Sequence, residues 1–472
     1  MKNKSIWNDV EIEKFNNSFS GVLKTDVLIV GAGITGLTTA YFLKDVDEKI
    51  VVVDKGKICE GITNKTTGKV NYLQGAVHQK IERYHGFDKA KLYYESSKEA
   101  INIIKNIIKL NNIDCDLVKE PSCTFTLEEC NIKKITREEE LLRVFGENVK
   151  FINDKRILKG IEVLNGYSFH PIKYLKGMVN SIKDKVEIYE DTLVTSYERE
   201  NNRYVVQTNK GKIITKKLVI ACHYLFFIIP LLTPLKTHLK REYVNVGKVN
   251  VNKKYNAINI DKNLHSIRFH EDYLIYTSNE HKLTSKFNYK KNRKKSIKEF
   301  KKYFGNSPEY SWINQDIVSN DYLPFIGKVK NNLYVATAFN GWGMTNGTIA
   351  GKLIADLILK KENKYETLFN PRRMSMTLII NSIVESSSYL KAYLYSYIKP
   401  NPVFIKKGGM TYGIYKDDKG IKHSIKLICP HMKCKLIFNY EDETWDCPCH
   451  GSRFDLDGNI IEGPSVHHIK EE

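Results

Sequence analysis

The sequence of 472 residues lacks a hydrophobic run long enough to cross a membrane, and cysteines are sparse outside one C-terminal segment. The longest apolar stretch, residues 218–232, is interrupted by His223 and Pro230, whereas a spanning helix needs about 20 mostly apolar residues. The opening segment MKNKSIWNDVEIEKF contains no apolar core of a secretory signal. We therefore expect a cytoplasmic protein, because no disulfide-framework spacing links five of its cysteines: Cys59, Cys115, Cys123, Cys130 and Cys222.

Acidic residues are in deficit, with 54 aspartates and glutamates against 74 lysines and arginines, a formal net charge of +20. The excess is spread along the chain, which indicates a composition bias rather than a nucleic-acid-binding patch. The densest basic run, residues 290–302, predicts a helix with Ile297, Phe300 and Phe304 on one face and lysines outside. We expect a solvated helix face there and no nucleic-acid partner; an anionic partner is the alternative.

A glycine-rich turn follows the first apolar run. Val27–Val30 is of strand type, Gly31, Gly33 and Gly36 form G-x-G-x-x-G, and the next residues continue as a helix. The first glycine permits a tight turn, the second lets the backbone approach a pyrophosphate, and the third allows close helix–strand packing. A second strand ends at Asp54, whose carboxylate could accept hydrogen bonds from a ribose diol. This pattern predicts a dinucleotide site but does not separate FAD from NAD.

A second glycine loop, nearly 300 residues later, favours FAD. Residues 321–359 indicate a turn, a strand, a loop with Gly341 and Gly343, and a helix from about Thr345. This segment resembles the D-amino-acid dehydrogenase and glycine oxidase family, in which D-x-x-P-x-I-G and G-W-G-M-T motifs close over the flavin. The resemblance implies FAD contacts at Gly341, Gly343, Met344 and Thr345. In residues 61–70 it places Thr66 and Thr67 in a loop that approaches the cofactor.

Four metal-binding side chains stand in two short loops near the C-terminus: Cys429-x-His431 and Cys447-x-x-His450. Two thiolates and two imidazoles suit a cluster whose two irons differ, although they are also zinc ligands. The segment resembles the Rieske [2Fe–2S] motif, including Gly451-Ser452, which zinc does not explain. By resemblance to the respiratory Rieske proteins, two further cysteines, Cys434 and Cys449, would form a disulfide that ties the loops together.

The resemblances together imply three parts. An α/β FAD-binding lobe of Rossmann type is interleaved with an α+β substrate lobe, and a small all-β Rieske domain follows. We place the N-terminal extension at 1–23, the oxidoreductase domain at 24–370, a linker helix at 371–400 and the Rieske domain at 401–472. Within the oxidoreductase domain the nucleotide lobe would comprise about 24–85, 155–225 and 315–365. An aromatic stripe in 374–398 leaves interfacial membrane contact as an alternative to simple docking.

The middle of the chain contains no motif that identifies a substrate or a catalytic base. Arg241, Tyr243 and Arg268 are candidates for holding a substrate carboxylate, although ordinary packing roles are favoured for each. His223 either faces the flavin or is a hydrogen-bonded histidine at a strand end. Phe454 stands where the respiratory Rieske proteins usually have a tyrosine that donates a hydrogen bond to the cluster.

We expect an FAD-dependent oxidoreductase that oxidises an amine or amino acid and passes electrons through the cluster to a one-electron acceptor. Two alternatives stay open. One is a flavin oxidase that uses oxygen, with the Rieske domain as a redox sensor or structural cap. The other is a non-enzymatic electron carrier that receives electrons from a partner protein.

Overall fold

The computed structural model describes residues 2–13, 15, 19–226, 233–251, 254–285, 289–398 and 404–469. Residues 399–403 and 470–472, which include the expected end of the linker helix and both ends of the expected Rieske domain, lie outside the described residues. Within the described parts of the chain, no helix is both long and apolar enough to cross a membrane.

The first lobe is built on an eight-stranded sheet. Its strands are β1 (Gly21–Val30), β2 (Ile50–Val53), β7 (Glu187–Tyr189), β8 (Val194–Glu200), β9 (Arg203–Thr208), β10 (Gly211–Ile220), β16 (Phe325–Lys330) and β17 (Leu333–Thr337). The order β16-β17-β10-β1-β2-β7 is parallel from β17 to β7, and β9 joins β10 antiparallel. The last four residues of β1 and all of β2 are apolar and buried, as expected for parallel strands covered on both faces.

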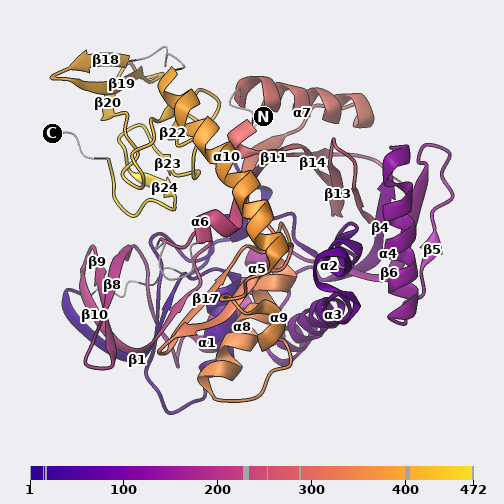
Figure 1. Ribbon diagram of the computed structural model, residues 1–472, viewed down its shortest axis with the longest axis horizontal. Helices are drawn as coiled ribbons and strands as arrows, with labels where there is room; N and C mark the ends of the chain where they lie inside the picture. Colours follow the sequence, from indigo (N-terminus) through magenta and orange to yellow (C-terminus); the bar gives the residue numbers. More distant parts are fainter. Residues whose placement is uncertain are drawn as a thin grey trace.

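Alternate residues of β1 enter two different cores. Val27 and Ile29 pack with helices α1 (Ile34–Leu43), α3 (Phe87–Leu110), α5 (Pro171–Ile182) and α8 (Gly343–Ile358). Leu28 and Val30 pack on the other face with residues of β8, β9 and β10. The first lobe thus has three layers: the helices, the parallel strands, and the pair β8 and β9 over the other face of these strands. Figure 1 shows α8 beside β17 in this lobe.

The second lobe is a nine-stranded, mostly antiparallel sheet in the order β15-β11-β14-β13-β12-β4-β6-β3, with β5 beside β6. Its strands are β3 (Lys69–Val70), β4 (Val118–Thr126), β5 (Lys150–Phe151), β6 (Lys159–Ser168), β11 (Thr237–Lys248), β12 (Asn256–Asn259), β13 (His265–His270), β14 (Tyr273–Lys282) and β15 (Tyr310–Ser319). Segments of the first lobe precede, divide and follow these strands along the chain. The predicted α/β lobe interleaved with an α+β lobe is therefore confirmed.

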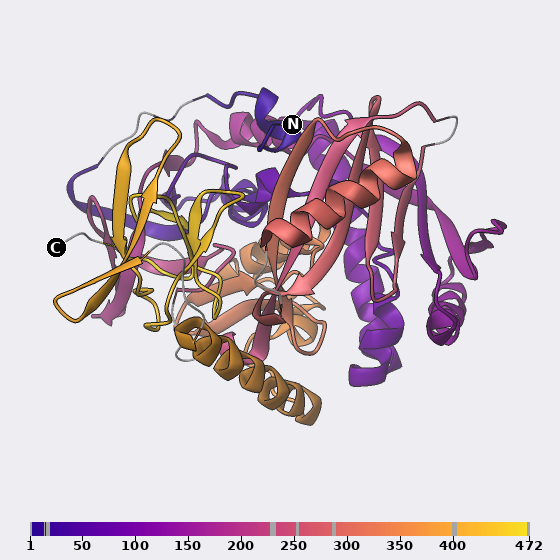
Figure 2. The same ribbon diagram turned by 90° about the horizontal axis from the view of Figure 1, so that it is seen from above.

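The remaining helices flank the lobes. The basic run 290–302 lies in α7 (Tyr289–Phe304), which Figure 2 shows beside the strands of the second sheet. This helix buries Phe300 against the second sheet and leaves Lys294 and Lys298 exposed. The others are α2 (Val77–His85), α4 (Ile132–Val144), α6 (Thr233–Lys236) and α9 (Glu366–Phe369), with 3-10 helices η1 (Ile6–Asp9), η2 (Ile62–Lys65), η3 (Glu129–Asn131) and η4 (Leu283–Ser285).

The C-terminal domain is all-β, as predicted. A three-stranded sheet holds β18 (Phe404–Lys407), β19 (Met410–Lys416) and β20 (Lys422–Lys426), and a four-stranded sheet holds β21 (Ile437–Asn439), β22 (Thr444–Asp446), β23 (Arg453–Phe454) and β24 (Ile460–Glu462). The core between them includes Trp445, Phe454 and Cys447.

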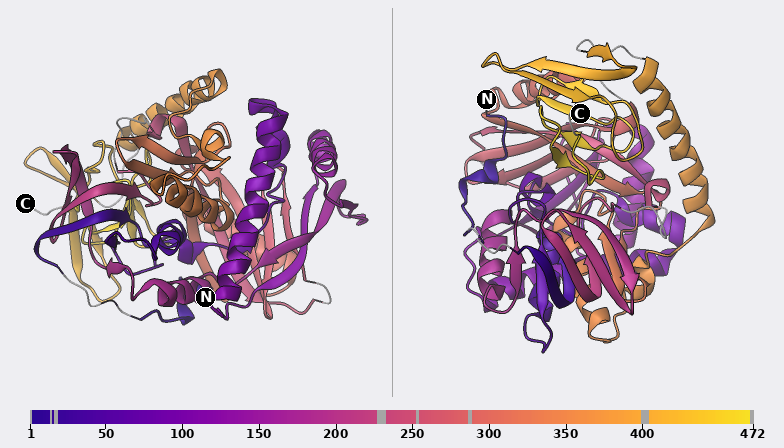
Figure 3. Two further views of the ribbon diagram at one scale, coloured as in Figure 1. Left: turned by 90° about the horizontal axis from the view of Figure 1, so that it is seen from below. Right: turned by 90° about the vertical axis from the view of Figure 1, so that its left-hand side faces the viewer.

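Helix α10 (Met376–Ile398) connects the first lobe to this domain and runs along one side of the molecule, as the right-hand view of Figure 3 shows. Tyr389 stacks on His450, and Tyr397 donates a hydrogen bond to the carbonyl of Lys433. The helix leaves an apolar face exposed: Met376, Ile380, Ile383, Leu390, Leu394 and Ile398. Its aromatic stripe thus serves partly for docking, and membrane contact through this face stays a prediction.

Candidate functional site

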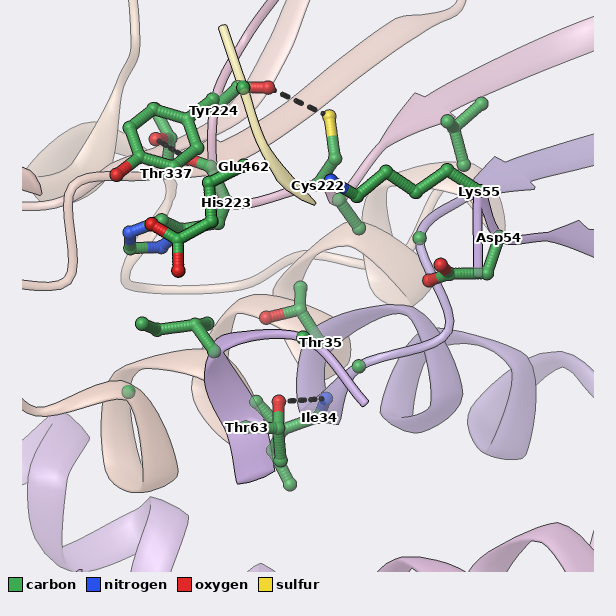
Figure 4. Close-up of a pocket in the computed structure, with 18 of the residues that line it drawn as sticks. Ile34, Thr35, Asp54, Lys55, Thr63, Cys222, His223, Tyr224, Thr337 and Glu462 are labelled. Atoms are coloured by element: carbon green, nitrogen blue, oxygen red, sulfur yellow. Dashed lines mark hydrogen bonds between the residues drawn. The ribbon is translucent and has the colours of Figure 1, made fainter. Parts of the chain in front are cut away.

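A cavity of about 330 Å³ lies at the carboxyl ends of β1, β2 and β10, where ligands of α/β sheets bind. Figure 4 shows Asp54 and Lys55 at one end, the start of α1 below, and His223, Tyr224 and Glu462 at the other end. Asn314 and Phe339 also line it, so both lobes contribute to its wall. The cavity is elongated and bounded by two glycine-rich turns, which suits one long dinucleotide.

Two glycines set the turn before α1. Gly31 has a φ of +111°, and a Cβ atom there would lie 2.8 Å from the Ala221 carbonyl oxygen. A Cβ atom on Gly36 would lie 1.8 Å from the Gly31 carbonyl oxygen, so α1 can pack this closely only with glycine there. Gly33 caps α1 and lines the cavity, where the free N–H groups of the helix N-terminus favour a phosphate. The three glycines thus have the geometry that the sequence predicted.

The Asp54 carboxylate is held by the backbone around the turn. One oxygen accepts a hydrogen bond from Ala32 N at 2.7 Å and the other from Gly56 N at 3.0 Å. Burial raises its pKa, although these two hydrogen bonds and Lys55 act in the opposite direction. The two hydrogen bonds therefore fix the Asp54 carboxylate in one orientation. Asp54 also lines the cavity, where a ribose would lie.

The second glycine loop lies across the cavity from the first. Gly341, Gly343 and Met344 line the cavity, as does Thr66 from the loop after η2. Two further predicted contacts, Thr67 and Thr345, are not among the lining residues and stay predictions. The Thr67 carbonyl accepts a hydrogen bond from Arg268, and the Thr345 hydroxyl accepts one from Gln74 at 2.9 Å. Both threonines thus contact residues that lie behind the cavity lining.

The four predicted cluster ligands come together in the C-terminal domain. The Cys447 thiol contacts Cys429 and lowers the pKa of Cys429 to about 7. The rings of His431 and His450 lie 5.1 Å apart, and each has a buried Nδ1 atom without a partner among the described residues. Burial lowers the pKa of both histidines, so they are neutral, as iron ligands must be. Two thiols and two unpartnered imidazole nitrogens fit a [2Fe–2S] cluster of Rieske type.

The remaining two cysteines of the segment form the disulfide that the resemblance implied, Cys434–Cys449. The Cys447 sulfur lies within 4.8 Å of both disulfide sulfurs, so the bridge joins the two ligand loops directly beside a ligand. The Ser452 hydroxyl contacts Cys429 and accepts a hydrogen bond from Ser465 N at 3.0 Å. Ser452 is therefore placed beside a sulfur ligand, as expected.

Replacing Phe454 with tyrosine should raise the reduction potential of the cluster. Phe454 is fully buried in the core that contains Cys429 and Cys447, so an added hydroxyl would lie near cluster sulfur. A hydrogen bond that favours the reduced state about tenfold shifts a one-electron potential by about 59 mV. The wild type should lie in the lower part of the Rieske span of about −150 to +300 mV. Protein voltammetry measures both values. Tyr415→Phe is the control, and an unchanged potential in Phe454→Tyr would contradict the expectation.

The C-terminal domain completes the first cavity, which the sequence did not predict. Residues 461–466 line the cavity together with Gly33 and Gly343. Lys65 forms an ion pair with Glu462, and Lys55 Nζ donates to the Ile461 carbonyl at 2.6 Å. Gly463-Pro464 is a turn signal, but no local pattern indicates what it contacts.

A second, smaller cavity connects this wall to the cluster ligands. It is lined by His431 and His450, and it shares Tyr224, Thr337 and Pro464 with the first cavity. One layer of side chains thus separates the cavity expected to hold FAD from the two histidines.

The candidate carboxylate-holding residues have other roles. Arg241 is fully buried and donates to Asp446 of the C-terminal domain at 2.9 Å. Arg268 donates to the carbonyls of Thr67 and Phe169, and Tyr243 stacks on His281. The cavity's lining residues include none of the three.

The position of His223 is compatible with both expectations for this residue. It lines the cavity, and its Nε2 atom lies 3.2 Å from the Gln315 carbonyl oxygen. It is therefore a hydrogen-bonded histidine at a strand end that also faces the expected FAD site.

The family model of the FAD dependent oxidoreductases matches residues 26–357, and that of the Rieske [2Fe-2S] domain matches residues 389–471. A Bacillus subtilis (strain 168) protein described as a Rieske 2Fe-2S iron-sulfur protein, YhfW, is 29% identical over 473 residues, 94% of this chain and 93% of the relative. The gamma-glutamylputrescine oxidoreductase of Escherichia coli (strain K12) is 22% identical over 73% of this chain and 86% of its own.

Glycine oxidase from Geobacillus kaustophilus has the same fold, with a TM-score of 0.63 and 15% identity over 75% of this chain and all of that one. The cluster motif is therefore a Rieske [2Fe–2S] site rather than a zinc site, because the matching C-terminal model is that of the Rieske domain. The chain belongs to the family of FAD dependent oxidoreductases and continues into a C-terminal Rieske [2Fe-2S] domain.

Proposed function

We propose that the protein oxidises an amine or amino acid and passes the electrons through its Rieske cluster to a one-electron acceptor. When bound, FAD would accept a hydride from the carbon next to nitrogen, and the cluster would release electrons singly. Two related proteins, the E. coli gamma-glutamylputrescine oxidoreductase and the Geobacillus glycine oxidase, are named for compounds with such carbons. The acceptor is a protein or small molecule of unknown identity, and the cytoplasmic location stays a prediction from cysteine use.

The observation that carries this proposal is the wall shared by the two cavities. Tyr224, Thr337 and Pro464 line both the cavity with the glycine turns and the cavity with His431 and His450. A structural cap over FAD would need only residues 461–466. Both expected histidine ligands also lie behind this wall, which a cap would not require. Their location favours electron transfer over a cap.

Buried contacts fix the separation of the two centres. Arg241 on β11 pairs with Asp446 on β22, and Gln315 on β15 donates to the Gly451 carbonyl at 3.0 Å, next to the His450 ligand. Both Arg241 and Asp446 are completely buried. These contacts dock the Rieske domain on the second lobe in one orientation, which would hold the two centres at a constant separation.

Reducing the flavin by light under anaerobic conditions tests electron transfer without any substrate. Freeze-quenched samples should show the rhombic EPR signal of a reduced Rieske cluster, at about one cluster per flavin, as the flavin is reoxidised. Iron and flavin are quantified on the same sample. A flavin that stays reduced beside an oxidised cluster would contradict the relay and favour the oxidase alternative.

A further inference from the structure

The wall that the second lobe contributes to the cavity is acidic. Glu242 on β11 is paired in register with Asn314 on β15, and Lys240 with Asp316. Side chains alternate between the two faces of a sheet. The neighbours of these residues, Arg241 and Gln315, contact the Rieske domain on the opposite face. The face with Asn314 and Asp316 therefore looks into the cavity, which both residues line.

Among the described residues, neither Glu242 nor Asp316 forms an ion pair with a lysine or an arginine. Lys240 is bound to Glu280 at 2.6 Å, whereas Glu242 accepts a hydrogen bond from the Asn314 amide at 2.8 Å. Asp316 accepts one from Ile317 N at 2.8 Å and lies 3.6 Å from His223 Nε2. Burial lowers the pKa of His223, so that ring is neutral at pH 7. Burial raises the pKa of Asp316, and it raises the pKa of Glu242 to about 7. A cation bound beside them would stabilise both carboxylates.

A second observation indicates that a hydrogen-bond donor is missing from this wall. The Asn314 Oδ1 atom is buried and has no donor among the described residues, because the amide nitrogen of the side chain is turned to Glu242. A buried oxygen without a donor is destabilising, because it has lost its hydrogen bonds to water. An ammonium group has up to three N–H donors, which could serve Asn314 and Asp316 together.

The described lining of the cavity has no arginine that would pair with a substrate carboxylate. No arginine is present among its described lining residues, whereas four acidic residues are: Asp54, Glu60, Asp316 and Glu462. The two lysines in the lining are already engaged, Lys65 with Glu462 and Lys55 with the Ile461 carbonyl. An anionic group at the wall of the second lobe would therefore meet like charges and no free cation.

We propose that Asp316 and Asn314 select a substrate that binds as an alkylammonium and has no carboxylate beside its reacting carbon. This inference rests on the proposed function and narrows its substrate class from amines and amino acids to amines. Asp316 also receives the proton that the ammonium loses before the carbon next to nitrogen can give up its hydride to FAD.

Two nearly isosteric ions of opposite charge test the binding step on the holoprotein, without turnover. Calorimetry should show that tert-butylammonium binds and that pivalate binds with an affinity at least about tenfold lower. Asp316→Asn should lower the affinity for tert-butylammonium at least about tenfold, since a hydrogen bond to a charged group contributes that much. Glu140→Gln, an exposed acid on α4, is the matched control and should leave binding unchanged.

Anaerobic flavin reduction tests the same selection in turnover. Pyrrolidine, putrescine and cadaverine should bleach the flavin faster than proline, ornithine and lysine, which are the same compounds with an added carboxylate. Equal or tighter binding of pivalate, faster reduction by the amino acids, or no binding of either ion would overturn the inference. Light-driven reduction of the cluster uses no substrate. If the cluster were reduced by light while one of these contrary results was obtained, the substrate inference would be wrong and the proposed electron transfer would still stand.

Discussion

Replacing Cys447 with serine is expected to abolish turnover with one-electron acceptors while leaving reduction of the flavin by substrate unchanged. Cys447 is buried, contacts Cys429 and lies beside the Cys434–Cys449 disulfide, as expected for a cluster ligand whose thiolate a serine hydroxyl does not replace. Loss of a residue that only supports a metal ligand typically costs 10–100-fold, so loss of the ligand itself should exceed about 100-fold. Steady-state rates with an artificial one-electron acceptor measure the effect.

The same variant separates the relay from its alternatives. Flavin content should stay normal, because Cys447 is not among the residues that line the cavity expected to hold FAD. Cys130→Ser, an exposed free cysteine far from the cluster motif in sequence, is the control and should change neither rate. If Cys447→Ser turned over normally with the acceptor, electrons would leave the flavin directly. The Rieske domain would then be a sensor or cap, as the oxidase alternative requires.

The parts of both sites that could be predicted are those set by local sequence. The turn follows from the positive φ of Gly31 and from the close approach of Gly36 to the Gly31 carbonyl, five residues before it. The ligand pairs Cys429–His431 and Cys447–His450 follow from short loops. Thr67 and Thr345, which are not among the lining residues, stay predictions. Each lies one residue from a lining residue, and whether it faces the cavity or the core behind it depends on backbone turns that a motif does not specify.

The junction could not be predicted, because it depends on contacts between distant parts of the chain. Arg241 and Asp446 are 205 residues apart, and their pairing requires that β11 show its odd-numbered side chains to the Rieske domain. A shift of register by one residue would exchange the two faces. Arg241 would then lie in the cavity as the carboxylate-binding candidate, and Glu242 would be at the junction. Sequence alone does not choose between these arrangements.

Replacing Asp446 with asparagine is expected to destabilise the docked Rieske domain by about 3–5 kcal/mol, the usual cost of breaking a buried ion pair from one side. Asp446 accepts from Arg241 at 2.9 Å and from Arg453 at 3.2 Å, and all three side chains are buried. The isosteric amide would remove the negative charge between Arg241 and Arg453 and one of its two acceptor oxygens, and Arg241 would keep Gln315 and the Tyr289 ring as its other contacts. Urea unfolding followed by flavin fluorescence measures the loss. Light-driven cluster reduction should slow in parallel, because the domain would dock less rigidly.

The pH dependence of this effect distinguishes the charge of Asp446 from its shape. Burial alone would raise the pKa of Asp446, but Arg453 and Arg241 outweigh it and hold that pKa below its usual value of about 3.9. A depressed folded-state pKa gives stability that is present at neutral pH and is lost as the pH falls through the folded-state value. The difference between wild type and Asp446→Asn should therefore be full at pH 7 and shrink below about pH 4. The exposed pair Arg156–Asp154 supplies the control, since Asp154→Asn should cost less than about 1 kcal/mol. A difference for Asp446→Asn that persists unchanged in acid would mean that packing, and not the ion pair, holds the two domains together.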